Sequence, residues 1–196
     1  MQDSAVLSCS CGQVRLDIAG SPPAGGVRLS CYCKDCRAFP THLGATQILD
    51  DWGGVDLYQC PPDRLAIRAG AELLSALRLS PKGPLRWYAT CCGTPLALTP
   101  ATTALPFVSL SVAAIHGADL GPRTAVVFSE QALAGPEPAP SNFGLSGVVL
   151  KLLRRVLAAY LTGKRKVTPF FDQTGNPISV PTVLSRDERT KATTLP

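Results

Sequence analysis

The spacing of the cysteines is the most informative feature of this sequence. Cys60 stands alone, and the other seven cysteines fall in three short groups. These groups are Cys9-Ser10-Cys11-Gly12, Cys31-Tyr32-Cys33-Lys34-Asp35-Cys36 and Cys91-Cys92-Gly93. Zn²⁺ prefers thiolate sulfur in a tetrahedral arrangement, and closely spaced cysteines in a turn can converge on one ion. The grouping therefore predicts one or two zinc sites, with inert buried thiols or a disulfide as the alternative.

The middle group can supply three ligands from one short loop. Cys31, Cys33 and Cys36 would leave one tetrahedral position open, which is the usual arrangement of a catalytic zinc. The first and third groups lie far apart in the sequence, and strand pairing could bring them together into a closed structural site. Cys60 has no near partner in the sequence, so we expect it to be a buried structural thiol.

A few polar side chains near the middle group could assist chemistry. His42 lies six residues after Cys36 and is a candidate acid–base group or fourth ligand, with a purely structural histidine as the alternative. Lys34, Asp35 and Arg37 lie within or beside the loop and could orient a substrate, although ordinary surface charge is the simpler interpretation. The candidate catalytic set is therefore the three cysteines of the middle group together with His42.

The hydrophobic pattern of the first two thirds of the chain is typical of a mainly β domain. Apolar and polar residues alternate at residues 14–18, which is the period of a half-buried strand. Similar short runs recur at residues 65–67, 77–79, 85–88, 96–98, 107–112 and 125–128. Turn signals of Gly and Pro separate them. Many short strands with frequent turns predict an antiparallel β domain of two packed sheets.

The pattern changes after a stretch of alternating prolines. Apolar residues at helical spacing predict one amphipathic helix over residues 145–161, with Gly163 at its C-terminal end. The residues beyond it are rich in Gly, Pro and basic side chains and predict an irregular tail. We therefore expect a zinc-binding β domain (1–134), a Pro-rich linker (135–144), and the C-terminal helix with its basic tail (145–196).

Positive charge is concentrated in the C-terminal segment. Residues 1–144 carry ten Lys and Arg against eleven Asp and Glu, whereas residues 145–196 carry nine against three. The apolar stripe of the helix could dock on the β domain, dock on a second copy of the chain to form a homodimer, or lie on an anionic membrane surface. Because the basic residues are confined to one short segment, we expect no nucleic-acid partner.

The N-terminal residues show no basic stretch followed by an apolar run, and no stretch approaches about 20 uninterrupted apolar residues. We therefore expect a cytoplasmic protein. In a reducing compartment, clustered cysteines favour metal binding or catalysis over disulfides.

The three cysteine groups, in this order and spacing, resemble the CENP-V/GFA domain family of glutathione-dependent formaldehyde-activating enzymes. The family pattern is Cys-x-Cys-Gly, then Cys-x-Cys-x-x-Cys, then Cys-x-x-Cys-Gly, and the resemblance covers roughly residues 5–130. Arg86 and Tyr88 stand where the family has Arg-x-Phe. The chain looks like a divergent bacterial branch of the family with a C-terminal extension.

The third cysteine group departs from this pattern at one position. Ala89 stands where the family has its first cysteine, and Cys91, next to Cys92, is the candidate replacement. Neighbouring residues of an extended chain point to opposite sides, so both thiols reach one ion only if the chain turns locally. Otherwise, Cys91 lies on the catalytic side or the structural site is absent.

The resemblance implies an Mss4-like β fold with two zinc ions. The implied ligands are Cys9, Cys11, Cys91 and Cys92 for the structural zinc, and Cys31, Cys33 and Cys36 for the catalytic zinc. It also implies a carbon–sulfur lyase or thiol-adduct enzyme that joins the thiol of glutathione to a small aldehyde. The alternative function is a non-catalytic, zinc-stabilised binding module, because a fold does not determine a function.

Overall fold

The computed structural model of the protein describes residues 5–20, 22–133 and 142–194. A four-stranded sheet contains β1 (Ala5–Ser8), β2 (Arg15–Ile18), β5 (Leu65–Ala69) and β10 (Ile115–His116). An eight-stranded sheet contains β3 (Val27–Cys31), β4 (Val55–Cys60), β6 (Leu74–Arg78), β7 (Leu85–Ala89), β8 (Pro95–Thr99), β9 (Val108–Ser111), β11 (Ala125–Val127) and β12 (Thr182–Val183). The helices are α1 (Pro22–Gly25), α2 (Lys34–His42), α3 (Leu145–Leu161) and α4 (Arg186–Thr193).

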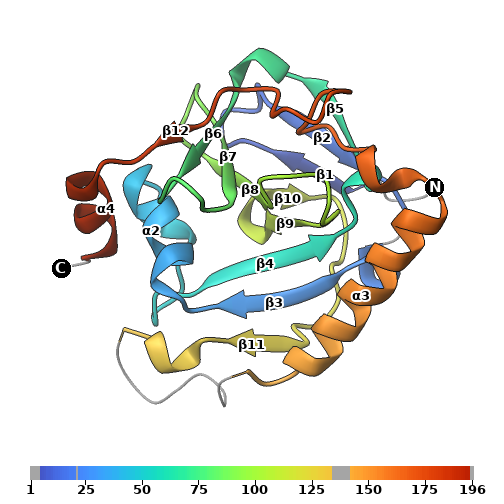
Figure 1. The fold of residues 1–196 in the computed structure, drawn as a ribbon. Helices are drawn as coiled ribbons and strands as arrows, with labels where there is room; N and C mark the ends of the chain where they lie inside the picture. The colour runs from blue at the N-terminus through green and yellow to red at the C-terminus, as the bar shows by residue number, and fades with distance from the viewer. Residues whose placement is uncertain (1–4, 21, 134–141, 195–196) are drawn as a thin grey trace.

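The described residues therefore form a mainly β protein with two sheets, as the sequence predicted (Figure 1). The strand orders are β10-β1-β2-β5 and β11-β3-β4-β9-β8-β7-β6-β12. All neighbouring strands are antiparallel except two pairs at the edges of the larger sheet, where β11 runs parallel to β3 and β12 runs parallel to β6. The prediction of a purely antiparallel domain was wrong at these edges, because both edge strands return from distant parts of the chain.

The hydrophobic core lies between the two sheets. Alternate residues of the β1–β2 hairpin, including Leu7 and Leu16, point inward from the four-stranded sheet and are fully buried. They belong to one cluster with Trp87 and Leu110 of the eight-stranded sheet. Cys60 lies in the same cluster and is fully buried, where burial raises the pKa of its thiol to about 12. This environment agrees with the expected structural role of Cys60.

Helix α2 was not predicted, and it begins inside the middle cysteine group. Cys33 is its N-terminal cap and accepts a hydrogen bond from the backbone N–H of Cys36. The helix contains Pro40, which normally disfavours a helix interior. Figure 1 shows α2 and α4 side by side, and Asp35 of α2 forms an ion pair with Arg189 of α4.

The prediction of an irregular C-terminal tail holds for residues 167–181, which form neither helix nor strand, and was wrong for β12 and α4 beyond them. In Figure 1 the tail crosses from α3 over the end of the sheets to β12 and α4. Phe170 and Phe171 are buried against Trp87, with ring centroids 5.0 and 6.4 Å from the indole. Helix α4 begins with a capping box between Ser185 and Glu188. These aromatic and capping contacts outweigh the Gly and Pro content on which the prediction relied.

Helix α3 has the predicted bounds, and Gly163 follows it with a φ of 72°. Val148 is buried against β3 and β11, and Arg155 donates a hydrogen bond to the carbonyl oxygen of Gln59. Much of the apolar stripe is nevertheless exposed, at Val149, Leu150, Leu153, Leu157, Tyr160 and Leu161. Most of the predicted linker, residues 135–141, lies outside the described residues. Within the described part of the chain, no helix is both long and apolar enough to cross a membrane.

Candidate metal centres

Two hairpin turns bring the first and third cysteine groups together. In the β1–β2 turn, the N–H of Gly12 donates to the carbonyl oxygen of Cys9, and in the β7–β8 turn the N–H of Gly93 donates to that of Ala89. The two glycines adopt φ angles of 77° and 68°, which are strained for residues with a Cβ. Each turn therefore reverses the chain within a few residues and presents two thiols on one side.

The four sulfur atoms are spaced as a tetrahedral metal site requires. The Sγ atoms of Cys9 and Cys11 lie 3.5 Å apart, those of Cys11 and Cys91 lie 3.3 Å apart, and those of Cys91 and Cys92 lie 3.8 Å apart. All four sulfurs lie within 4.8 Å of one another. A tetrahedron with zinc–sulfur bonds of about 2.3 Å has edges of about 3.8 Å. The four-cysteine group is therefore positioned to hold a metal ion.

The protonation of these thiols also favours a cation at their centre. Desolvation and the neighbouring thiols of Cys11 and Cys9 raise the pKa of Cys91 to about 12. Partial desolvation opposes ionisation of Cys92 too, but hydrogen bonds from Ser10 and Thr94 lower its pKa to about 5. Adjacent sulfurs cannot all ionise while they repel one another, whereas a bound cation makes every one of them a thiolate.

In the third cysteine group, the fourth sulfur of the site comes from Cys91 and not from position 89, where the Cys-x-x-Cys-Gly pattern has a cysteine. Ala89 is fully buried in β7, where it pairs with Leu74 of β6. Cys91 lies two residues later in the turn, and the local reversal places it beside Cys92. The structure therefore brings both adjacent cysteines to one group, and the four-cysteine group joins a hairpin of the smaller sheet to a hairpin of the larger one.

The middle cysteines form a second, three-cysteine group where β3 meets α2. Cys31 ends β3, Cys33 caps α2 and Cys36 lies in its first turn. The Sγ atoms of Cys31 and Cys33 are 3.4 Å apart, and all three sulfurs lie within 4.8 Å of one another. Local geometry is sufficient here, because a strand end and a helix start are separated by only two residues. All eight cysteines of the chain are free in the structure.

The three thiols divide their charge unevenly. Hydrogen bonds from Cys31 and Cys36, with backbone N–H groups at the start of α2, lower the pKa of Cys33 to about 2. The same hydrogen bonding and burial raise the pKa values of Cys31 and Cys36. Without a metal, Cys33 is therefore the thiolate of this group, and a bound cation would ionise Cys31 and Cys36 as well.

The other predicted site residues have different positions. His42 is in the last turn of α2, and a helical rise of about 1.5 Å per residue puts it about 9 Å along the axis from Cys36. The structure does not bring it to the three-cysteine group. Arg37 is buried and donates hydrogen bonds to three backbone carbonyls, those of Gly53, Tyr32 and Gln131. Its role is to fix α2 against its neighbours.

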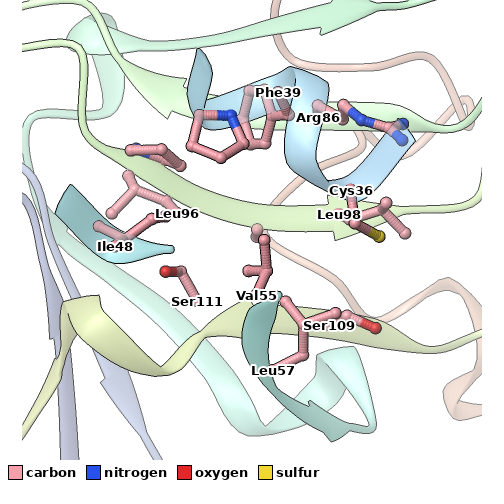
Figure 2. A pocket seen from close by; sticks show the side chains of 13 residues that line it. Cys36, Phe39, Ile48, Val55, Leu57, Arg86, Leu96, Leu98, Ser109 and Ser111 are labelled. Atoms are coloured by element: carbon pink, nitrogen blue, oxygen red, sulfur yellow. The ribbon is translucent and has the colours of Figure 1, made fainter. Parts of the chain in front are cut away.

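A small pocket adjoins Cys36, and sequence analysis missed it. It has a volume of about 30 Å³ and lies between α2 and the strands β4, β8 and β9 (Figure 2). Its lining is mostly apolar and comes from Cys36, Phe39, Pro40, Ile48, Val55, Leu57, Arg86, Pro95, Leu96, Ala97, Leu98, Ser109 and Ser111. A groove of about 660 Å³ beside the four-cysteine group shares Ile48, Pro95 and Ser111 with it. The short apolar run at residues 96–98 indicated a strand there, but nothing in the sequence indicated a pocket.

Comparisons with known proteins place the chain in a family. A protein from Rhodobacter sphaeroides with a known crystal structure is 18% identical, with a TM-score of 0.41, over 58% of this chain and 90% of that one. No curated protein matches the chain significantly. A sequence model of a family of unknown function, DUF6151, matches residues 1–180. Because this match spans most of the sequence, the chain belongs to the DUF6151 family.

Proposed function

We propose that this protein is a zinc-dependent carbon–sulfur lyase or thiol-adduct enzyme, related to the glutathione-dependent formaldehyde-activating enzymes. The observation that carries the proposal is the three-cysteine group beside a small apolar pocket. Three sulfur donors leave one tetrahedral position for an exogenous ligand, whereas the four-cysteine group leaves none. The three-cysteine group is therefore suited to catalysis, and the four-cysteine group is suited to a structural role.

Zinc is the metal that best fits both groups. Both donor sets consist of sulfur alone, which favours zinc or an iron–sulfur cluster over magnesium or calcium. Sulfur–sulfur distances of 3.3 to 3.8 Å suit a single tetrahedral ion. Glutathione is the proposed thiol substrate, in line with the family resemblance of the cysteine pattern.

A zinc ion at the three-cysteine group would hold an exogenous thiol as its thiolate at neutral pH. The protein's residues do the rest. Cys33 is fixed by the start of α2, and the apolar walls of the pocket exclude water from the reacting carbonyl. The thiolate sulfur forms a bond with the aldehyde carbon, the carbonyl π electrons move to oxygen, and that oxygen takes a proton from solvent. The reverse reaction cleaves the carbon–sulfur bond.

Native mass spectrometry of two matched variants tests this assignment. Wild-type protein should carry two zinc ions, and Cys33→Ser and Cys11→Ser should each carry one. Cys33→Ser should keep its circular dichroism spectrum but lose adduct formation between glutathione and formaldehyde, followed by NMR. If Cys33→Ser unfolds, the metal at the three-cysteine group is required for folding, and this result would support the non-catalytic binding module instead.

A second function, peripheral binding to an anionic membrane, is favoured by the exposed face of α3. Leu153 and Leu157 are each 60% exposed, and Lys151 and Arg154 lie beside this stripe on the same helix. A helix with leucines on one face and basic residues flanking them suits the interface of an acidic bilayer. Arg165 lies over the Tyr160 ring, which adds positive charge at the C-terminal end of the stripe.

Vesicle flotation tests the membrane proposal. The protein should bind vesicles that contain phosphatidylserine and not those of phosphatidylcholine alone, and added salt should weaken binding. The double variant Leu153→Glu/Leu157→Glu should abolish flotation without lowering thermal stability. If wild type never floats and the double variant converts a dimer to a monomer in gel filtration, a second copy covers this face and the membrane proposal fails.

A further inference from the structure

The four-cysteine group lies at the surface, although its residues join the two sheets of the fold. Cys9 is buried, but Cys11, Cys91 and Cys92 are all exposed. The members of the three-cysteine group are instead buried or half-buried, and they pack beside the apolar residues of β3, β11 and α3. The reactivity of a cysteine depends on its thiolate character and on its access to solvent. The four-cysteine group is therefore the more accessible of the two to small reagents.

A groove gives such reagents a further route to these sulfurs. The groove of about 660 Å³ beside the group is lined by Cys9, Cys11 and Cys92, together with Ser10 and Thr94. The Thr94 hydroxyl lies 3.0 Å from the Cys92 sulfur and donates a hydrogen bond to the Ser10 hydroxyl. One side of the site is thus open and polar, which suits the approach of hydrogen peroxide or a small organic hydroperoxide.

The sulfurs of Cys11 and Cys91 are placed to form a bond with each other. Their Sγ atoms lie 3.3 Å apart, and the two residues come from different hairpin turns, 80 positions apart in the sequence. A disulfide bond is about 2.0 Å long, so the sulfurs need to approach by only about 1.3 Å. None of the described residues packs within 4 Å of the position that a Cβ on Gly12 would occupy. The turn beside Cys11 therefore has room for this small movement.

The other short sulfur pairs are less suited to a disulfide. Cys91 and Cys92 are adjacent, and consecutive Cα atoms lie about 3.8 Å apart, which is closer than the range of about 4.4–6.8 Å found in disulfides. The sulfur of Cys9 lies 3.5 Å from that of Cys11, but Cys9 is buried and accepts the backbone N–H of Val14 at 3.2 Å. Burial and this hydrogen bond hold Cys9 in place. Cys11 and Cys91 are therefore the pair that an oxidant would join.

We propose that the four-cysteine group is a redox-sensitive metal site, at which a hydroperoxide joins Cys11 to Cys91 and the metal ion is released. With hydrogen peroxide, one of the two thiolates attacks an oxygen and the O–O bond breaks. That sulfur becomes a sulfenic acid, and the departing hydroxide is protonated to water. The other thiolate then attacks the same sulfur, the S–O bond breaks, and a second hydroxide leaves and is protonated. The two sulfurs together lose two electrons, which the peroxide gains.

The disulfide would dismantle the metal site without separating the hairpins. Only Cys9 and Cys92 remain as thiolates, and two sulfurs do not complete the tetrahedral set that zinc requires. The new bond links the β1–β2 turn to the β7–β8 turn, as the shared metal ion did before oxidation. Oxidation should therefore release one ion and leave the fold and the three-cysteine group in place. This inference depends on a metal ion in the four-cysteine group and not on the proposed catalysis.

Peroxide titration of the zinc-loaded protein is the first test. After a few equivalents of hydrogen peroxide, native mass spectrometry should show the loss of one zinc ion. An unreduced digest should contain the peptide of Cys11 joined to the peptide of Cys91, and dithiothreitol with added zinc should restore the original mass. Retention of both ions would overturn the proposal. Release of an ion with sulfinic acids in place of the Cys11–Cys91 bond would also overturn it.

Two histidine variants separate disulfide formation from metal binding. Histidine ligates zinc but cannot form a disulfide. Cys91→His should therefore keep two ions and release zinc several-fold more slowly under peroxide than the wild type. Cys92→His keeps both proposed partners, so it should release zinc at least as fast as the wild type. Equal release from the two variants would overturn the proposal, and if either variant fails to load zinc, the mapped disulfide of the wild type decides. Absence of adduct formation in the reduced wild type would refute the proposed function alone.

Discussion

Cys9 and Cys60 form a matched pair for testing whether sulfur binds metal or only fills space. Both side chains are buried in the same core cluster, with exposed fractions of 3% and 0%. Only Cys9 belongs to a group of cysteines that could hold an ion. We therefore compare Cys9→Ala with Cys60→Ala, because the two substitutions remove the same atom from similar surroundings.

The expected costs differ several-fold. Loss of one buried methylene-sized group costs about 1 kcal/mol, and this is the expected effect of Cys60→Ala on the free energy of unfolding. Cys9→Ala also removes the acceptor of the Val14 N–H, which lies 3.2 Å from the Cys9 sulfur, at a cost of about 2 kcal/mol. Structural zinc contributes on the order of 10 kcal/mol in small domains, so loss of one of four ligands should bring the total above about 5 kcal/mol.

Thermal unfolding with and without a chelator measures this difference. For a chain of this size, about 1 kcal/mol shifts Tm by roughly 2–4 °C. Cys60→Ala should therefore lower Tm by a few degrees and remain sensitive to chelation, like the wild type. Cys9→Ala should lower Tm by about 10 °C or more and respond much less to the chelator. Equal Tm losses in the two variants, with equal responses to chelation, would refute the reasoning.

Three further predictions concern reactivity and packing. When the three-cysteine group is emptied of metal in protein that stays folded, Cys33 should be alkylated by iodoacetamide at pH 6, because its pKa of about 2 keeps it a thiolate. Cys60, with a pKa of about 12, should resist alkylation until the chain unfolds, and equal labelling of the two by mass spectrometry would contradict this. Phe170→Ala should lower the free energy of unfolding by about 3–5 kcal/mol in urea, and Val180→Ala, at a 90% exposed position, should not change it. Arg37→Met leaves three backbone carbonyls without their donor, so it should cost about 3 kcal/mol or more in the same assay, and a cost below 1 kcal/mol would be inconsistent with those bonds.

Local signals predicted α3 well and α2 not at all. The apolar residues of α3 recur at helical spacing over 17 residues, and Gly163 ends the pattern. Helix α2 has nine residues, contains Pro40 and is capped by a cysteine instead of the usual Ser or Asp. The Ser185–Glu188 capping box of α4 was readable from the sequence, but the Gly and Pro content around it favoured an irregular tail.

The cysteine groups were predictable for a different reason from the pocket. Ligands that come from one turn or loop are close together whatever the rest of the chain does, so spacing indicated the three-cysteine group and each half of the four-cysteine group. The meeting of those two halves depends on long-range strand pairing. The pocket and the burial of Arg86 depend on how α2 packs over β4, β8 and β9. That packing is long-range, and the residues involved have no distinctive spacing in the sequence. The prediction for His42 failed for the opposite reason. It is close to Cys36 in the sequence, but six residues along a helix place it far from the sulfurs.

Anomalous X-ray scattering at the zinc absorption edge tests the central claim most directly. The account predicts two peaks in crystals of the purified protein. One should lie about 2.3 Å from the sulfurs of Cys9, Cys11, Cys91 and Cys92, and the other at the same distance from those of Cys31, Cys33 and Cys36. Crystals with no peak at either group, and sulfurs that are protonated or joined as disulfides, would contradict it.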